Sequence, residues 1–344
     1  MVNGLGHSLR NVAQWLPPAF VRPFGRPVAL FFHGVERRIC NAAVQSNQHD
    51  SAAFYQIVRL LRDNYDVLPL AAIKDVLARP EQHRRSVFLM SDDGYANNLS
   101  LAADILQDAG LPWTLFVSTR HIDTGERNPI FLARLFFLFA PQGRYAIANL
   151  VEPVELGSPE QRHAVAAVWI DRLRALDAAR ATEAVAAMQS AFAPADLAAL
   201  LDKFRSDSFL SWPQVAMLKS RGVEIGAHAH HHWPMHDGQT REYLREQATL
   251  SRTRIEAETG GTCRYFAYPF GNVSDVCREA WHAVRDAGYE YGFTTLSGSL
   301  DASRNPFLMP RYGLGPREPR LPSLVPFLRA GNRRLIGWQR LIGD

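Results

Sequence analysis

The stretch Ser86-Val87-Phe88-Leu89-Met90-Ser91-Asp92-Asp93-Gly94-Tyr95 contains a short apolar run that ends at two adjacent carboxylates and a glycine. Such a run is typical of a parallel strand covered on both faces. Side chains alternate along a strand, so Asp92 and Asp93 can face one point only if the backbone turns, and Gly94 has the freedom for that turn. Because two close carboxylates repel each other, both stay ionised only beside a cation, most simply a metal ion. A surface Asp-Asp-Gly turn is the alternative interpretation.

Strand-like and helix-like segments alternate on either side of this stretch. Strands are expected at 28–33, 67–70, 86–91, 113–117, 223–228, 265–268, 291–294 and 307–311. The alternation predicts an α/β fold, built as a parallel sheet or a (β/α) barrel. His33, Asp92, His228, Pro269 and Arg311 each stand at the end of an expected strand. That is where a barrel of this kind has its chemistry.

A different pattern runs from about residue 127 to residue 209, where alanine, leucine, arginine and acidic residues dominate. The apolar residues keep a period near 3.6, which predicts roughly four helices. We interpret this segment as a helical insertion in a single domain spanning residues 1–344. Insertions of this kind commonly form a lid or a wall over a site.

Composition and charge narrow the function classes. The chain has 344 residues, 47% hydrophobic and 21% charged, with a net charge of +4, which is ordinary for a soluble protein with a large core. No dense basic run is present, so a nucleic-acid partner is not expected. The three cysteines lack CxxC spacing and indicate reduced thiols. Neither a signal peptide nor a long apolar run stands out, so we expect a cytoplasmic protein.

A histidine cluster, His228-Ala229-His230-His231-His232, offers the nitrogen ligands of a metal site. His228 and His232 are four residues apart, so in a helical turn both rings would project to one side. With Asp93 they would leave positions open on the ion, as in a catalytic zinc site, although this ligand set also suits non-haem iron(II). Ala229 replaces the glutamate of an HExxH zinc protease, which excludes that chemistry. Incidental local enrichment in histidine is the alternative.

Three motifs resemble, in residues and in order, those of the NodB-type polysaccharide deacetylases (carbohydrate esterase family four). The motifs are Ser91-Asp92-Asp93-Gly94-Tyr95, then Glu224-Ile225-Gly226-Ala227-His228 with His232, then Phe266-Ala267-Tyr268-Pro269-Phe270-Gly271, within roughly residues 28–315. The resemblance implies an irregular (β/α) barrel of about seven parallel strands. It also implies metal-dependent hydrolysis of an N-acetyl group, or occasionally an O-acetyl or N-formyl group, on a sugar.

The same resemblance implies a role for each motif residue. Asp92 would be the general base, while Asp93, His228 and His232 would bind Zn²⁺ or another divalent ion such as Co, Ni, Mn or Fe. A backbone N–H near Phe270 would hold the oxyanion. The residues expected to surround the substrate and the oxyanion are Tyr95, Tyr268, Pro269, Phe270 and Gly271.

This chain departs from the family pattern at three places. Met90-Ser91 replaces the usual Thr-Phe, which changes packing more than chemistry. Ala267 stands where the family often has an arginine beside the base, and Arg311 is expected to replace that charge. The C-terminal Leu-x-His motif is missing, but His33 fits the place of the first-strand histidine in the exopolysaccharide de-N-acetylase branch. We therefore expect His33 to be the general acid, with a merely hydrogen-bonded histidine at a strand end as the alternative.

These features predict a metal-dependent hydrolase that removes an acetyl group from a sugar or glycan intermediate in cell-envelope polysaccharide biosynthesis. The alternatives are a deformylase acting on a lipid-linked amino sugar and a catalytically degenerate glycan-binding barrel. A basic amphipathic tail at about residues 321–344 suits an interfacial helix beside anionic lipid, which would make the protein peripheral to the inner membrane. A terminal helix packed on the barrel would explain the same composition.

Overall fold

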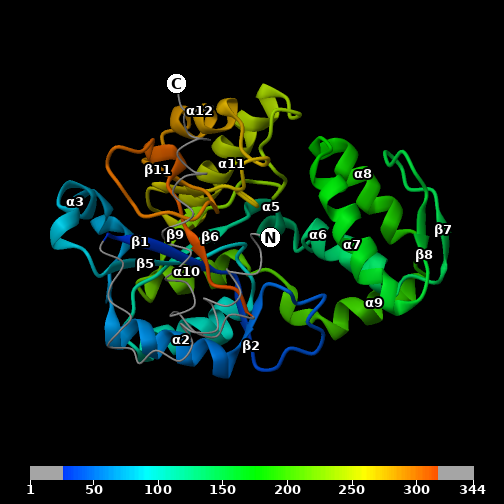
Figure 1. The fold of residues 1–344 in the computed structure, drawn as a ribbon, viewed down its shortest axis with the longest axis horizontal. Helices are drawn as coiled ribbons and strands as arrows, with labels where there is room; N and C mark the ends of the chain where they lie inside the picture. The colour runs from blue at the N-terminus through cyan, green and yellow to red at the C-terminus, as the bar shows by residue number, and fades with distance from the viewer. Residues whose placement is uncertain (1–25, 317–344) are drawn as a thin grey trace, which may run out of the picture.

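The computed structural model of the protein, described here for residues 26–316, is a curled parallel sheet surrounded by helices (Figure 1). Its seven main strands are β1 (Val28–Phe32), β5 (Ser86–Ser91), β6 (Thr114–Val117), β9 (Glu224–Ala227), β10 (Tyr265–Ala267), β11 (Tyr291–Phe293) and β12 (Tyr312–Gly313). They pair in the order β11-β10-β9-β6-β5-β1-β12, and all pairs are parallel. The predicted irregular (β/α) barrel is confirmed.

The two ends of the sheet meet at the segment that leads into β12. Met309 forms a parallel bridge with Phe293 of β11, and Tyr312 then pairs with Leu30 of β1. The predicted strand at 307–311 is wrong in its position. Residues Pro306–Leu308 form a 3-10 turn instead, because the Asn305 side chain accepts a hydrogen bond from the Phe307 N–H.

Both faces of the sheet are apolar, as the continuous apolar runs require. Alternate strand residues, among them Phe31, Phe88 and Phe116, fill the interior of the barrel together with Leu70, Ile73, Val76 and Leu77. The remaining strand residues pack against the outer helices. These helices are α2 (Ser51–Asn64), α4 (Ala103–Asp108), α5 (Thr119–Thr124), α10 (Trp212–Ser220), α11 (Arg241–Thr259) and α12 (Arg278–Asp286), whereas α3 (Ile73–Ala78) belongs to the interior cluster.

Three further short strands complete the barrel region. β4 (Asp66–Val67) pairs with the first half of β5, where the sequence pattern predicted a longer strand. β2 (Gly34–Glu36) and β3 (Gln48–Asp50) form a separate parallel pair directly after β1. This pair carries the chain from the end of β1 around the mouth of the barrel.

The expected insertion forms a lobe with its own apolar cluster beside the barrel, green in Figure 1. It contains the four helices α6 (Pro129–Phe139), α7 (Pro159–Arg174), α8 (Ala178–Gln189) and α9 (Pro194–Lys203). It also contains an antiparallel hairpin of β7 (Gly143–Tyr145) and β8 (Val154–Leu156), which the sequence pattern did not reveal. Strands this short show too few alternations to be recognised.

Within the described residues no single helix is long and apolar enough to cross a membrane, and only the bent pair α8 and α9 meets that length and composition. The tail at about 321–344, for which membrane contact was predicted, lies outside the described residues. Its predicted contact therefore stays a prediction.

Candidate active site

A cavity of about 400 Å³ lies where the strands of the barrel end and the insertion begins. Seven of the residues expected at the site share its lining, namely His33, Asp92, Asp93, Tyr95, His228, His232 and Phe270. Both aspartates have an exposed fraction of only 2%. The interpretation of Asp92-Asp93-Gly94 as a surface turn is therefore wrong.

The backbone leaves the strand geometry at Asp93 and Gly94, whose φ angles are 75° and 90°. Neighbouring strands hold this turn: the Asp92 N–H donates to the Phe32 carbonyl (3.0 Å), and the Ser118 N–H donates to the Asp93 carbonyl (3.2 Å). A side chain at Gly94 would be strained, because its Cβ would meet Val117 at 3.2 Å and its φ favours glycine. Both carboxylates thus reach the cavity through a turn in which Asp93 itself adopts the left-handed conformation.

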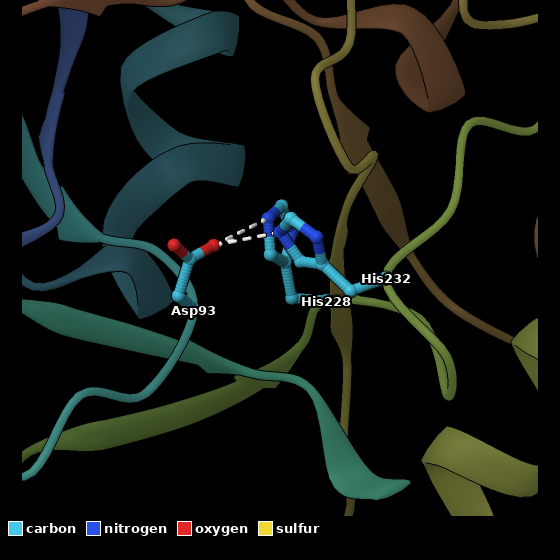
Figure 2. A group of neighbouring side chains, drawn as sticks. All are labelled: Asp93, His228 and His232. Atoms are coloured by element: carbon cyan, nitrogen blue, oxygen red, sulfur yellow. Dashed lines mark hydrogen bonds and ion pairs between the residues drawn. The ribbon is translucent and has the colours of Figure 1, made fainter. Parts of the chain in front are cut away.

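Asp93, His228 and His232 turn their ligand atoms toward one point (Figure 2), all within 4.8 Å of one another. The Asp93 Oδ1 lies 2.8 Å from the His232 Nε2 and 3.3 Å from the His228 Nε2. The His228 Nδ1–H donates to the Ala267 carbonyl (2.8 Å), which directs the Nε2 lone pair toward Asp93. Such support behind a histidine is typical of metal ligands, and the three residues fit a divalent cation.

The helical turn predicted for His228 and His232 is wrong. Residues 228–232 form a loop in which Ala229 and His232 both have a φ of 58°. The loop is held by Gln247, whose Oε1 accepts hydrogen bonds from the N–H groups of His230 (3.2 Å) and His231 (2.8 Å). The spacing of the histidines therefore indicated the correct pair, but the predicted geometry was different. Two left-handed residues in a loop, and not a helical turn, bring the rings together.

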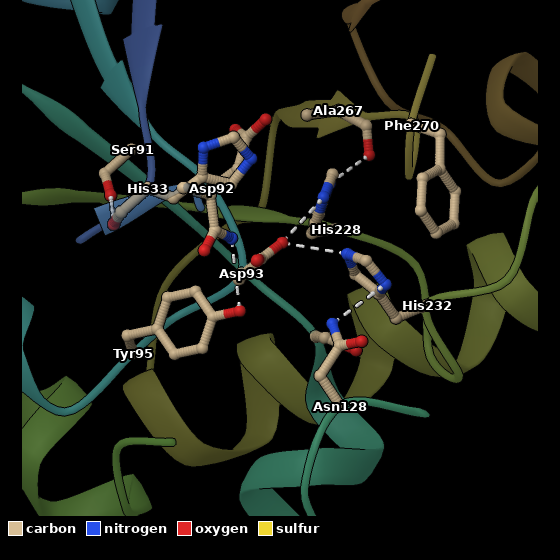
Figure 3. Close-up of polar contacts among 12 residues, drawn as sticks. His33, Ser91, Asp92, Asp93, Tyr95, Asn128, His228, His232, Ala267 and Phe270 are labelled. Atoms are coloured by element: carbon tan, nitrogen blue, oxygen red, sulfur yellow. Dashed lines mark hydrogen bonds and ion pairs between the residues drawn. The ribbon is translucent and has the colours of Figure 1, made fainter. Parts of the chain in front are cut away.

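Asn128 is a site residue that the sequence did not reveal. Its Nδ2 lies 3.2 Å from the His232 Nδ1, and its Oδ1 accepts a hydrogen bond from the Ile130 N–H (2.9 Å) (Figure 3). Asn128-Pro129 has the form of a helix start, and the residue is indeed the N-cap of α6. Nothing in that pattern shows that the same amide would reach the candidate metal ligand His232 from the insertion.

Asp92 is paired with Arg311 inside the barrel. The two terminal nitrogens of Arg311 donate to the two carboxylate oxygens of Asp92, at 2.7 and 2.8 Å. Burial opposes ionisation of Asp92, but the Arg311 guanidinium holds the pKa of that carboxyl below its ordinary value. Ala267 has no side chain that could do this, so Arg311 occupies the role expected for the missing arginine.

The charges of Asp93 and of the histidines beside it stabilise one another. Burial works against the charged form of Asp93, yet His232 and His228 hold its pKa well below the usual range. Burial also works against the charged form of His228, and Asp92 and Asp93 nevertheless raise its pKa. A divalent cation would replace the proton that these carboxylates favour on the imidazole.

His33 lies beside Asp92 at the end of β1 (Figure 3) and lines the cavity. Its ring packs edge-on to Phe31, with 5.7 Å between the centroids, and makes no hydrogen bond to any residue between 26 and 316. The alternative of a hydrogen-bonded strand-end histidine is therefore not supported. Burial lowers the pKa of His33, although Asp93 and Asp92 favour the protonated form.

The third motif contributes one residue to the cavity. Phe270, with a φ of 60°, lines it, and its ring lies against His232 at 5.2 Å between centroids. Its backbone N–H has no hydrogen-bond acceptor in the described part of the chain. Pro269 and Gly271 shape the turn, with the Gly271 N–H donating to the Pro269 carbonyl (2.6 Å). They are not among the residues that line the cavity.

The two tyrosines expected at the substrate lie in different places. Tyr95 lines the cavity, stacks on Phe209 and accepts a hydrogen bond from the Asn47 amide (3.3 Å). Tyr268 is fully buried, and its hydroxyl donates to the Phe307 carbonyl (3.0 Å). The structure thus does not place Tyr268 at the substrate, because strand alternation directs it into the core.

Comparisons with known proteins agree with this geometry. The sequence model of the polysaccharide deacetylase family matches residues 79–292, a span that contains the candidate metal ligands and Asp92 but neither His33 nor Arg311. No curated protein matches the sequence.

Several solved structures have a similar fold. The deacetylase PplD of Streptococcus pyogenes, in complex with acetate, is 14% identical, with a TM-score of 0.55 over 85% of this chain and 93% of that one. IcaB from Ammonifex degensii is 14% identical, with a TM-score of 0.55 over 88% and 97%. A de-N-acetylase from Aggregatibacter actinomycetemcomitans is 16% identical, with a TM-score of 0.53 over 88% and 100%. At these identities the similarity shows a common fold.

Proposed function

The chain belongs to the polysaccharide deacetylase family, and from this premise we propose that it is a metal-dependent hydrolase that removes the N-acetyl group of a sugar. The observation that carries the proposal is the meeting of two groups in one cavity: the ligand atoms of Asp93, His228 and His232, and the Arg311-paired carboxylate of Asp92. The three ligand atoms suit a divalent cation. The carboxylate of Asp92 suits a general base that stays ionised at neutral pH.

Asp93, His228 and His232 would hold the ion, for which we propose Zn²⁺. When bound, such an ion supplies Lewis-acid chemistry by polarising the acyl carbonyl and making water more acidic. Asp92 removes a proton from the attacking water, and Arg311 keeps its carboxylate in place. The free N–H of Phe270 donates to the oxygen that becomes negative as the carbonyl carbon becomes tetrahedral.

His33 completes the reaction by protonating the leaving amine nitrogen as the C–N bond breaks. Because burial lowers its pKa, the resting ring is neutral, and it needs a proton before it can act as an acid. The proton that Asp92 takes from water can serve this step, since both side chains line the same cavity and follow the paired strand ends Phe32 and Ser91. The products are acetate and the free amine.

The structure weakens the case for a degenerate barrel. That interpretation relied on the missing arginine at Ala267 and on the missing C-terminal histidine. Arg311 reaches Asp92 in place of the first, and His33 lines the cavity in place of the second. We further propose that the substrate is a cytoplasmic intermediate of cell-envelope glycan assembly.

The experiment that tests the proposed function is acid release from a panel of donors. The zinc-loaded protein is incubated with N-acetylated and N-formylated sugars, free, nucleotide-linked and lipid-linked, and the released acid is identified. We expect acetate from at least one donor, and a rate about 10²–10⁴-fold lower from Asp92→Asn. Formate alone would identify a deformylase instead, and no acid from any donor would contradict the hydrolase assignment.

A further inference from the structure

Arg134 is the single charged side chain of α6, an otherwise apolar helix with the sequence Pro-Ile-Phe-Leu-Ala-Arg-Leu-Phe-Phe-Leu-Phe. It follows Ile130 by four residues, so both side chains project from one helix face, and both line the active-site cavity. Placing a guanidinium among apolar side chains costs free energy unless the charge is paired. Because Arg134 lines the cavity, we expect its partner to lie there.

Arg134 has no such partner in the described part of the chain, where it forms neither an ion pair nor a hydrogen bond. Burial lowers the pKa of its guanidinium, while Tyr95, Asp93 and Asp207 act in the opposite direction. These three groups are thus its negative or ionisable surroundings, yet none of them forms a hydrogen bond or an ion pair with it. The guanidinium keeps its donors free on the side of the cavity formed by the insertion.

Each of the other charged groups that line the cavity has an ion-pair or hydrogen-bond partner. The pairs are Asp92 with Arg311, Asp93 with His228 and His232, Arg174 with Asp275 (2.7 and 2.8 Å), and Asp207 with the amides of Gln45 (3.2 Å) and Gln48 (3.1 Å). Among the described lining residues, Arg134 is left as the one charged group without a partner. The missing counter-charge is one that a ligand can bring.

We propose that Arg134 binds an anionic group of the substrate, a phosphate or a carboxylate carried by the acylated sugar. This inference rests on the proposed function, since it specifies which sugars the same site accepts. A guanidinium matches both anions with two parallel hydrogen bonds, and such charge-assisted bonds are stronger than neutral ones. A neutral sugar would leave the guanidinium unpaired, so the site discriminates against it.

The test measures the binding of deacetylated products, so that turnover is not required. Glucosamine, glucosamine 1-phosphate, glucosamine 6-phosphate and the corresponding uronic acid are titrated into the zinc-loaded protein by calorimetry. We expect at least one anionic ligand to bind more tightly than glucosamine, by a factor on the order of ten to one hundred. The ranking of the phosphates and the uronic acid identifies which anion the site takes.

Variants then assign the preference to Arg134. In Arg134→Gln the ratio of the dissociation constant of glucosamine to that of the preferred anionic ligand should fall toward one. Arg134→Lys should give an intermediate ratio. Arg127→Gln is the matched control: it removes a nearby positive charge whose guanidinium is bound to the carbonyls of Leu201, Phe204 and Arg205 and which does not line this cavity. Its ratio should equal that of the wild type.

Two results would overturn the inference. The first is that the wild type binds no anionic ligand better than glucosamine, a result that needs no variant to be folded. Alternatively, Arg134→Gln could keep the full preference, which would place the anion on the metal ion rather than on α6. An Arg134-dependent preference without any acid release from the donor panel would support the anion site and contradict the proposed hydrolase function, so the two failures are distinct.

Discussion

Arg311 and Asp92 lie 219 positions apart in the sequence, yet they form a bidentate ion pair with an exposed fraction of 0% for the arginine side chain and 2% for the aspartate. The pair joins the segment that closes the barrel to the end of the strand β5. The guanidinium also lies over the Phe31 ring, 4.4 Å from its centroid, and its Nε donates to the Thr294 carbonyl (3.1 Å). One residue therefore connects barrel closure with the position of the proposed base.

Arg311→Met should destabilise the protein strongly. The variant leaves the Asp92 carboxylate buried without its partner, which typically costs about 3–5 kcal/mol of unfolding free energy. Urea unfolding measures the loss, and the double variant Asp92→Asn with Arg311→Met should recover much of it. A single variant as stable as the wild type would show that the pair does not hold the barrel together.

Asp92 and Asp93 should separate by role when each is changed to asparagine. Asp93→Asn is expected to lose the bound metal, because an amide is a weaker ligand than a carboxylate. Asp92→Asn should keep the metal and lose turnover by about 10²–10⁴-fold, the usual contribution of a general base. Metal analysis of both purified proteins, with acetate release, checks this. Equal metal content in the two variants contradicts the division of roles.

His33→Ala should affect substrates according to their leaving groups. Release of an amine needs a proton, so hydrolysis of an N-acetyl sugar should fall by about 10²–10⁴-fold. An activated ester such as 4-nitrophenyl acetate releases a stable anion, and its hydrolysis should change little. Asp92→Asn serves as the control that lowers both rates. If His33→Ala lowers both rates equally, the ring positions the substrate and is not the acid.

Asn128 should matter for metal affinity although it is not a ligand. Its amide supports the His232 ring, and removal of such support typically weakens metal binding by about 10–100-fold. Asn128→Ser keeps a side chain able to cap α6 and removes the amide, whereas Asn128→Ala removes both. Competition with a chelator measures the affinity, and both variants should weaken it alike. An unchanged affinity in Asn128→Ser would assign the residue to helix capping alone.

His49 should make the stability depend on pH. It is buried, its Nε2–H donates to the Leu314 carbonyl (2.8 Å), and burial lowers its pKa to about 4. The unfolded chain then binds the extra proton near pH 6.5, so folding stability is lost as the pH falls from about 6.5 to about 4, by about 3 kcal/mol for this group. His49→Gln keeps a donor and should flatten this part of the curve in urea unfolding. A curve of unchanged slope would contradict the assignment.

Much of the site could be predicted because its residues stand at strand ends. The apolar runs before His33, Asp92 and His228 each indicate a buried parallel strand, and parallel strands end at one edge of a barrel. The motifs at Asp92-Asp93-Gly94 and around Phe270 are local, so the short stretch itself contains the turn that directs the side chains. The family resemblance then identified which of these residues belong together.

The remaining features depend on contacts between distant segments. The loop at 228–232 adopts its shape because Gln247 of α11 holds its N–H groups, and no local pattern predicts a left-handed His232. Asn128 and Arg134 reach the cavity only because the insertion folds back against the mouth of the barrel.

The local order of residues is enough to predict the barrel strands and the two carboxylates, because each depends on one strand and the turn that follows it. The spacing also indicated His228 and His232, but the loop that brings their rings together depends on the distant Gln247. The sequence also predicted that Arg311 supplies the charge beside Asp92, but only the tertiary structure shows that this pair is bidentate and buried. That Tyr268 faces the core and that Arg134 faces the cavity without a partner among the described residues are likewise seen only in the tertiary structure. These facts arise from barrel closure and from packing of the insertion. Both bring together residues that are far apart in the chain, and no short stretch of sequence specifies them.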